Sequence, residues 1–206
     1  IGNFFMTNVS DRRIKTLLFL LIFMLVSFLI AWKLYERFLN NDLSKRESMY
    51  CALAEEIAAK HSVPSALVKA VIWKESRWQA NVVGGHGEIG LMQITDGAVA
   101  DWQRLQKKDK KPSRKDLFKP ELNIEIGTWY LSWTSGHWKD YKAAELLQLA
   151  EYNAGYTRVN TLWKPKNPQD DLALEKISFP STRDYIRQVL ERKKYYEKLE
   201  NTNYKN

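Results

Sequence analysis

One stretch near the start of the chain, residues 16–32, carries no charge and is apolar almost throughout. As an α-helix this stretch rises about 25 Å at ~1.5 Å per residue, slightly less than a ~30 Å hydrocarbon core. Lys15 and Lys33 flank it, and their long side chains can reach the headgroup region at either end. The stretch therefore predicts a membrane-spanning helix, with the remainder of the chain folded outside the bilayer.

A cleaved signal peptide is the main alternative for this stretch. The run is long and aromatic for a signal peptide, and it lacks a small-x-small cleavage site. A lipoprotein signal is disfavoured further, because Met49 and Tyr50, which precede the single cysteine Cys51, are not the small residues of a lipidation site. An uncleaved anchor is the favoured interpretation.

Positive charge before the run sets the expected orientation. Arg12, Arg13 and Lys15 favour an N-terminus in the cytoplasm, although basic residues after the run dilute this signal. We expect a short cytoplasmic segment at 1–13, the anchor at 14–35, a linker at 36–48, a domain outside the cytoplasm at 49–200 and a tail at 201–206.

Composition limits how that domain is stabilised and what it binds. One cysteine excludes an intrachain disulfide framework, but roughly 150 residues can build a sufficient core. The net charge of +8 suits an anionic polymer or surface. The basic cluster at 107–115 is more typical of an exposed loop, and we expect no nucleic-acid binding. His61, His86 and His137 lack metal-ligand spacing, so no metal or other cofactor is expected.

Apolar residues recur at helical spacing along the domain, and no strand pattern is convincing, so we expect a mainly α fold. Four glycines between residues 84 and 90 indicate a tight, folded-back segment. Helices are predicted at 49–60, from the Ser62–Pro64 start signal to about 76, up to about 106, at 123–135, at 143–152 and at 182–199.

A carboxylate lies at the end of an apolar helical stripe. Leu67, Val71 and Glu75 are spaced four residues apart and share one helix face. A side chain in this position is either paired or kept protonated. Burial raises a carboxyl pKa, which makes such a glutamate a candidate general acid near neutral pH.

Short segments at and after Glu75 resemble the lytic transglycosylases of the soluble type, family 1. Glu75 with Ser76, residues 90–94 and residues 151–155 carry the resemblance, and residues 117–127 and 179–189 are similar to two further motifs of that family. Each motif alone is weak, but five in the same order, over roughly residues 50–196, are specific. The resemblance implies a mainly α, lysozyme-like (goose-type) domain behind the transmembrane helix.

The resemblance also implies roles for individual residues. Glu75 matches the single catalytic acid/base. The positions that match substrate-binding residues are Ser76, Met92, Gln93, Tyr152, Asn153 and Tyr185. Such enzymes cleave the β-1,4 bond between N-acetylmuramic acid and N-acetylglucosamine in peptidoglycan, with attack by the muramic 6-hydroxyl and a 1,6-anhydro product. The expected partners are glycan strands, the membrane, and a secretion, conjugation or division machinery.

Two other functions stay open. Ordinary glycosidases use two carboxyl groups, so Glu88 or Glu151 acting as a general base would make the protein a goose-type-lysozyme-like hydrolase. A cleft without turnover would leave a peptidoglycan-binding scaffold. Structural roles compete at single positions as well: Ser76 as a helix terminus, Met92 and the tyrosines as core, and most tryptophans as core.

Overall fold

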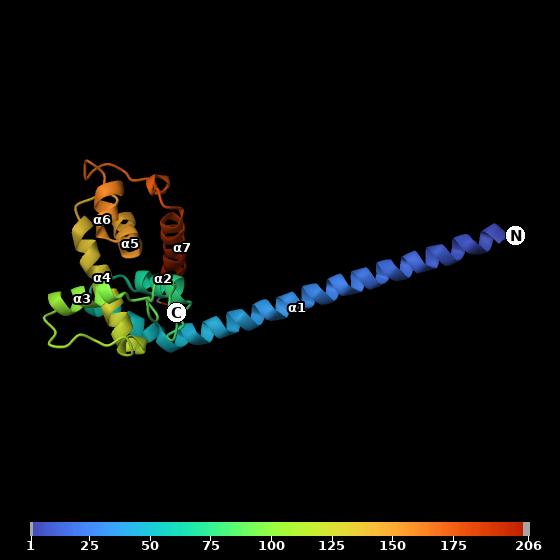
Figure 1. Ribbon diagram of the computed structural model, residues 1–206, viewed down its shortest axis with the longest axis horizontal. Coiled ribbons are helices and arrows are strands. Elements are labelled where there is room, and N and C mark those ends of the chain that lie inside the picture. The colour runs from blue at the N-terminus through green and yellow to red at the C-terminus, as the bar shows by residue number, and fades with distance from the viewer. Residues whose placement is uncertain (1, 204–206) are drawn as a thin grey trace. The chain divides into compact units, whose positions relative to one another are not determined.

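The computed structural model describes residues 2–203, and the chain divides into two compact units, 1–45 and 46–206. The described residues of the first unit form the N-terminal part of α1 (Gly2–Lys60). The second unit contains the end of α1 and a set of shorter helices (Figure 1). These are α2 (Ser65–Ser76), α3 (Asp96–Leu105), η1 (Asp116–Phe118), α4 (Pro120–Trp138), α5 (Ala144–Ala154), α6 (Tyr156–Arg158), η2 (Val159–Trp163), η3 (Leu174–Lys176) and α7 (Pro180–Asn203).

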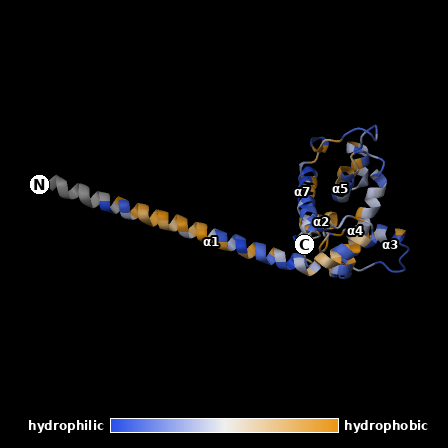
Figure 2. Ribbon diagram, turned by 180° about the vertical axis from the view of Figure 1, so that it is seen from behind, coloured by the Kyte–Doolittle hydropathy of each residue, from blue (hydrophilic) through white to orange (hydrophobic). Residues whose placement is uncertain are grey.

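The first unit presents an apolar surface. Within the described residues, one helical segment, Ile14–Lys60, contains a window long and apolar enough to cross a membrane. The large apolar side chains of this window are exposed. The ribbon of α1 is coloured orange, for hydrophobic residues, along this stretch (Figure 2). Exposed apolar surface of this extent is unfavourable in water and favourable in lipid. Residues 36–48, expected as a linker or a helix extension, continue α1 as helix.

The second unit is helical, as the periodicity predicts. Its described residues contain no strand, only two isolated antiparallel bridges that join Val83 to Ile89 and Ile89 to Ile94. These bridges fold the glycine-rich segment back on itself. The segment connects α2 to α3, and so brings the residues that follow Glu75 in sequence back toward the helix that carries Glu75.

Helix boundaries differ from the expected ones where local chemistry decides them. α2 begins at Ser65, because Ser62 adopts a positive φ of 54° outside the helix and Pro64 takes the N-cap position. α5 continues to Ala154 and ends only at Gly155, whose φ of 86° suits glycine. The short helices over residues 156–163 are absent from the sequence prediction.

The apolar stripe of α2 forms the centre of the core. Leu67, Val71 and Ile72 are at most 2% exposed, and α2 packs chiefly against α7. α2 ends at Ser76, and the C-cap residue Arg77 has a left-handed backbone conformation that turns the chain out of the helix. The helix therefore stops one residue after Glu75 and leaves that carboxylate at the edge of the core.

Candidate active site

Glu75 lies in the last turn of α2 and is half-buried. The pKa of its carboxyl is raised from 4.5 to about 7, chiefly because burial disfavours the charged form and, to a smaller extent, because of the negative charge of Glu88. Tyr185 and Lys74 oppose this shift because they stabilise the carboxylate. A group with this pKa exchanges protons near neutral pH, as a general acid and base must.

Two tyrosines from separate helices lie close to this carboxyl. Tyr185, on α7, is 3% exposed, and its hydroxyl interacts with Glu75 but completes no well-formed hydrogen bond among the described residues. Tyr152, on α5, donates its hydroxyl proton to the carbonyl of Met92 at 3.0 Å. Burial, and then the charge of Glu75, raises the pKa of both phenols well above 10. Both therefore stay neutral hydrogen-bond donors beside the acid.

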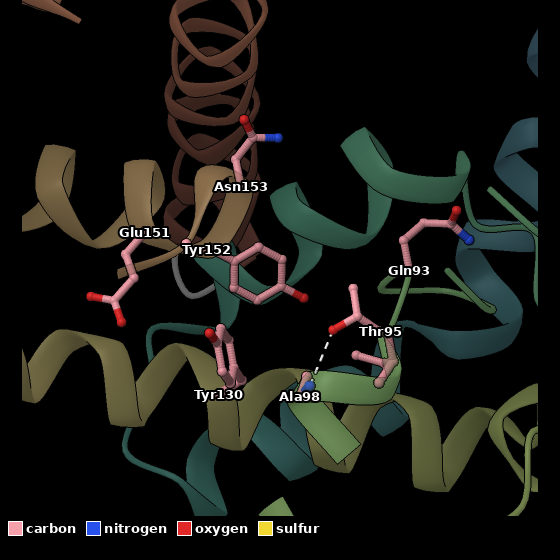
Figure 3. Close-up of a pocket in the computed structure, with 9 residues that line it drawn as sticks. Gln93, Thr95, Ala98, Tyr130, Glu151, Tyr152 and Asn153 are labelled. Atoms are coloured by element: carbon pink, nitrogen blue, oxygen red, sulfur yellow. Dashed lines mark hydrogen bonds between the residues drawn. The ribbon is translucent and has the colours of Figure 1, made fainter. Parts of the chain in front are cut away.

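A pocket of about 180 Å³ adjoins this cluster. Figure 3 shows Tyr152 and Tyr130 on one side of the pocket and Gln93 with Thr95 on the other. Glu75 is not among the lining residues. Tyr152 lines the pocket and also lies close enough to Glu75 to feel its charge. The lining residues are Gln93, Ile94, Thr95, Ala98, Tyr130, Glu151, Tyr152, Asn153 and Gly155.

Gln93 and Asn153, both predicted from the motifs, line this pocket. Gln93 has a positive φ of 49°, and its amide donates to the carbonyls of Gly90 at 2.9 Å and Val82 at 3.4 Å. The Asn153 side-chain oxygen accepts a hydrogen bond from the Thr182 hydroxyl at 2.9 Å, which ties α5 to α7. The amide groups of both residues are thus held in fixed orientations at the pocket wall.

Ser76 and Met92 lie beneath the site. The Ser76 hydroxyl is buried and is positioned between the carbonyls of Leu91 at 2.8 Å and Ile72 at 3.1 Å. Met92 is 0% exposed and packs on Gly127, while its carbonyl receives the Tyr152 hydroxyl. The structure therefore gives both residues supporting contacts, and direct contact with glycan stays a prediction for them.

Tyr130, Thr95 and Gly155 also line the pocket, although no role in catalysis or binding was predicted for any of them from the sequence. Tyr130 lies on α4, where the sequence signal was only apolar helical spacing. Its ring meets the Tyr152 ring edge-on at 5.7 Å, and burial raises its pKa to about 12. Only the packing of α4 on α5 brings these two aromatic rings together.

The two other candidate carboxylates have different surroundings. Glu151 is fully buried, and its side chain points away from the Tyr152 ring (Figure 3). It accepts a hydrogen bond from Trp138 Nε1 at 2.6 Å and pairs with His137 Nδ1 at 3.0 Å. Glu88 keeps a quarter of its side chain exposed and accepts the His86 amide proton at 3.1 Å. Within the described residues, no group of three or more potential metal ligands occurs.

The raised pKa of Glu75 has a consequence for stability that can be measured without substrate. The folded protein binds this proton more tightly than the unfolded chain, so its stability decreases as pH rises from 4.5 to about 7. Glu75→Gln removes the ionisation. We expect the difference in unfolding temperature, variant minus parent, to be more positive at pH 8 than at pH 4.5 by thermal denaturation. A difference independent of pH would show that the Glu75 pKa is ordinary.

Comparison with curated proteins gives relatives with a common name. The chain is 33% identical over 175 residues to the soluble lytic murein transglycosylase of Escherichia coli strain K12, which covers 81% of this chain and 25% of that protein. It is 34% identical over 104 residues to the membrane-bound lytic murein transglycosylase C of Yersinia enterocolitica, which covers 50% of this chain and 29% of the relative. The chain thus spans between a quarter and a third of the length of these relatives.

A solved structure extends the similarity to the fold. The lytic transglycosylase Slt from Pseudomonas aeruginosa, solved as an inactive Glu→Gln mutant, matches 73% of this chain and 24% of its own, with a TM-score of 0.64 and 28% identity. This confirms the lysozyme-like α fold expected from the motifs. The family model described as "Transglycosylase SLT domain" matches residues 52–173, which is more than half of the sequence. The chain belongs to the transglycosylase SLT domain family.

Proposed function

We propose that this protein is a peptidoglycan lytic transglycosylase that cleaves the β-1,4 bond between N-acetylmuramic acid and N-acetylglucosamine. The observation that carries the proposal is the environment of Glu75. This glutamate lies within the SLT domain, next to two tyrosines and near a pocket, and its pKa is raised to about 7. The relatives bear the name of this activity, and a Glu→Gln change accompanies inactivity in the Pseudomonas aeruginosa protein.

Glu75 serves first as the acid and then as the base. In its neutral form it protonates the glycosidic oxygen, and the bond from that oxygen to the muramic C1 breaks. The substrate's own acetamido group stabilises the positive charge that develops at C1. The Glu75 carboxylate then takes the proton of the muramic 6-hydroxyl, whose oxygen forms the new bond to C1. One carboxyl is enough, because it is reprotonated in the second step.

Intramolecular attack gains from proximity, since the 6-hydroxyl is part of the same sugar ring as C1. Glu151, one candidate base for a competing water, is buried and already accepts hydrogen bonds from Trp138 and His137. This favours the transglycosylase over a hydrolase that uses Glu151. Glu88 remains the carboxylate through which hydrolysis would act, because it is partly exposed and its charge reaches Glu75.

The nature of the product distinguishes the two reactions. We expect the full chain, incubated with purified sacculi, to release muropeptides that end in 1,6-anhydro-N-acetylmuramic acid, measured by mass spectrometry. Hydrolysis gives products that are heavier by one water. If the heavier species predominate in the wild type and the anhydro species appear when Glu88 is replaced by glutamine, the protein is a hydrolase with Glu88 as base.

The apolar window of α1 supports a membrane anchor for this activity, with the family domain outside the cytoplasm as the flanking charges predict. Anchoring would confine cleavage to glycan strands near the membrane. Such a position suits an enzyme that acts with a secretion, conjugation or division machinery. Protease protection of residues 46–206 in intact spheroplasts would contradict this orientation.

A further inference from the structure

An exposed aromatic residue follows the pocket-lining residue Gly155 in the chain. Gly155 lines the pocket, and Tyr156 is the next residue, with its Cα about 3.8 Å farther along the chain. Tyr156 is 47% exposed, although its neighbours on α5 contribute to the core. The motif over residues 151–155 ends at Gly155, and the function proposed above gives the Tyr156 ring no role.

The Tyr156 ring is supported on one side. It stacks on the ring of Trp138, with centroids 5.9 Å apart and planes inclined by 29°, and it meets the ring of His137 edge-on at 5.2 Å. Trp138 is 1% exposed and therefore lies beneath it. Trp138 packs against one face of the ring, so a sugar can pack only on the other face or on the edges.

The support is itself fixed by a buried carboxylate. Glu151 accepts a hydrogen bond from Trp138 Nε1 at 2.6 Å and pairs with His137 Nδ1 at 3.0 Å. Burial raises the pKa of Glu151, and its contacts with His137 and Trp138 oppose that shift. The Glu151 carboxylate thus holds the rings of both His137 and Trp138, against which Tyr156 packs. Tyr156 therefore needs little reordering to present a flat apolar face.

We propose that the exposed face of Tyr156 is a stacking platform for one pyranose ring of a glycan strand that extends beyond the pocket. This rests on the proposed function, since the strand in the pocket must be a β-1,4-linked N-acetylhexosamine polymer. The axial C–H groups of such a sugar carry partial positive charge and pack on the negative face of an aromatic ring. The platform lengthens the binding site by a sugar and increases affinity for long strands.

Binding without turnover tests this proposal. We take the full chain in detergent, carrying Glu75→Gln, and titrate it with β-1,4-linked N-acetylglucosamine oligomers of increasing length by calorimetry. Adding Tyr156→Ala should weaken binding of the longer oligomers about five- to tenfold and leave the shortest unchanged. Tyr156→Phe should keep the affinity, because the ring face rather than the hydroxyl makes the contact.

Tyr195 provides a matched control. It is 48% exposed on α7, so Tyr195→Ala removes an equally exposed ring elsewhere and should change no affinity. Equal affinities of the Tyr156→Ala and Tyr195→Ala proteins at every oligomer length would overturn the platform, as would equal losses from Tyr156→Ala and Tyr156→Phe. If the wild type releases muropeptides in those cases, the proposed function stands without the platform. If the wild type releases none, the proposed function has failed.

Discussion

Glu75→Gln is expected to reduce the release of muropeptides from sacculi by about three orders of magnitude, because general acid–base catalysis contributes factors of about 10² to 10⁴. Glutamine preserves the shape of the side chain but can neither donate the proton to the glycosidic oxygen nor take one from the 6-hydroxyl. The loss should appear in kcat rather than in KM, since both steps occur after binding. Initial rates from soluble products at several sacculus concentrations separate the two constants.

The matched control for this change is Glu191→Gln. Glu191 is exposed on α7, so the substitution removes one negative charge from the surface without touching the pocket. Its rate should equal that of the wild type. A Glu75→Gln protein that releases muropeptides within tenfold of the control would refute the acid/base role, and the pocket would then be a binding site without this catalyst.

Asn123→Ala is expected to lower the free energy of unfolding by about 3 to 5 kcal/mol. Asn123 is 1% exposed at the start of α4, and its amide donates to the carbonyls of Leu117 at 2.7 Å and Ile89 at 2.8 Å. Its oxygen accepts the amide proton of Met92 at 2.8 Å. Alanine would remove the partner of the Met92 N–H and of the Leu117 carbonyl, whereas the Ile89 carbonyl still accepts the Ile94 amide proton at 2.9 Å. Each buried group left without a partner costs about 1–3 kcal/mol.

Denaturant unfolding of the variant checks this value, with Asn81→Ala as the control. Asn81 is exposed, and its replacement should change stability by less than about 0.5 kcal/mol. We also expect Asn123→Ala to lower activity even where the protein is folded, because the segment that carries Met92 and Gln93 loses its attachment to α4. If the unfolding free energies of the Asn123→Ala and Asn81→Ala proteins lie within 1 kcal/mol of each other, allowing ~0.5 kcal/mol of error, the structural role of Asn123 is contradicted.

Several expectations from the sequence were confirmed. The mainly α, lysozyme-like fold follows from helical periodicity and from the motifs, and the family assignment agrees with it. Periodicity also places Glu75 at the end of an apolar stripe, and α2 ends there as expected. Five of the seven tryptophans after the anchor are buried, as predicted for most of them; these are Trp78, Trp102, Trp129, Trp138 and Trp163.

Other features were beyond the reach of sequence patterns. The boundary of α5 depended on the conformation of Gly155, and the two short helices over residues 156–163 had no periodic signal. Glu151 was a candidate base in the sequence because it is adjacent to Tyr152. Adjacency in the sequence does not show in which direction the Glu151 side chain points. Adjacent residues on a helix point about 100° apart, and packing buries Glu151 against His137 and Trp138 instead.

The sequence by itself determined the helical periods, the apolar window of α1 and the position of the proposed acid, because these depend on residue type and spacing along one chain. The tertiary structure alone decided what surrounds Glu75. Its raised pKa comes from burial at the junction of α2 with Tyr185 of α7 and Tyr152 of α5, side chains more than 70 positions away in the chain. Desolvation and charge act through space, so they depend on how helices pack rather than on the order of residues.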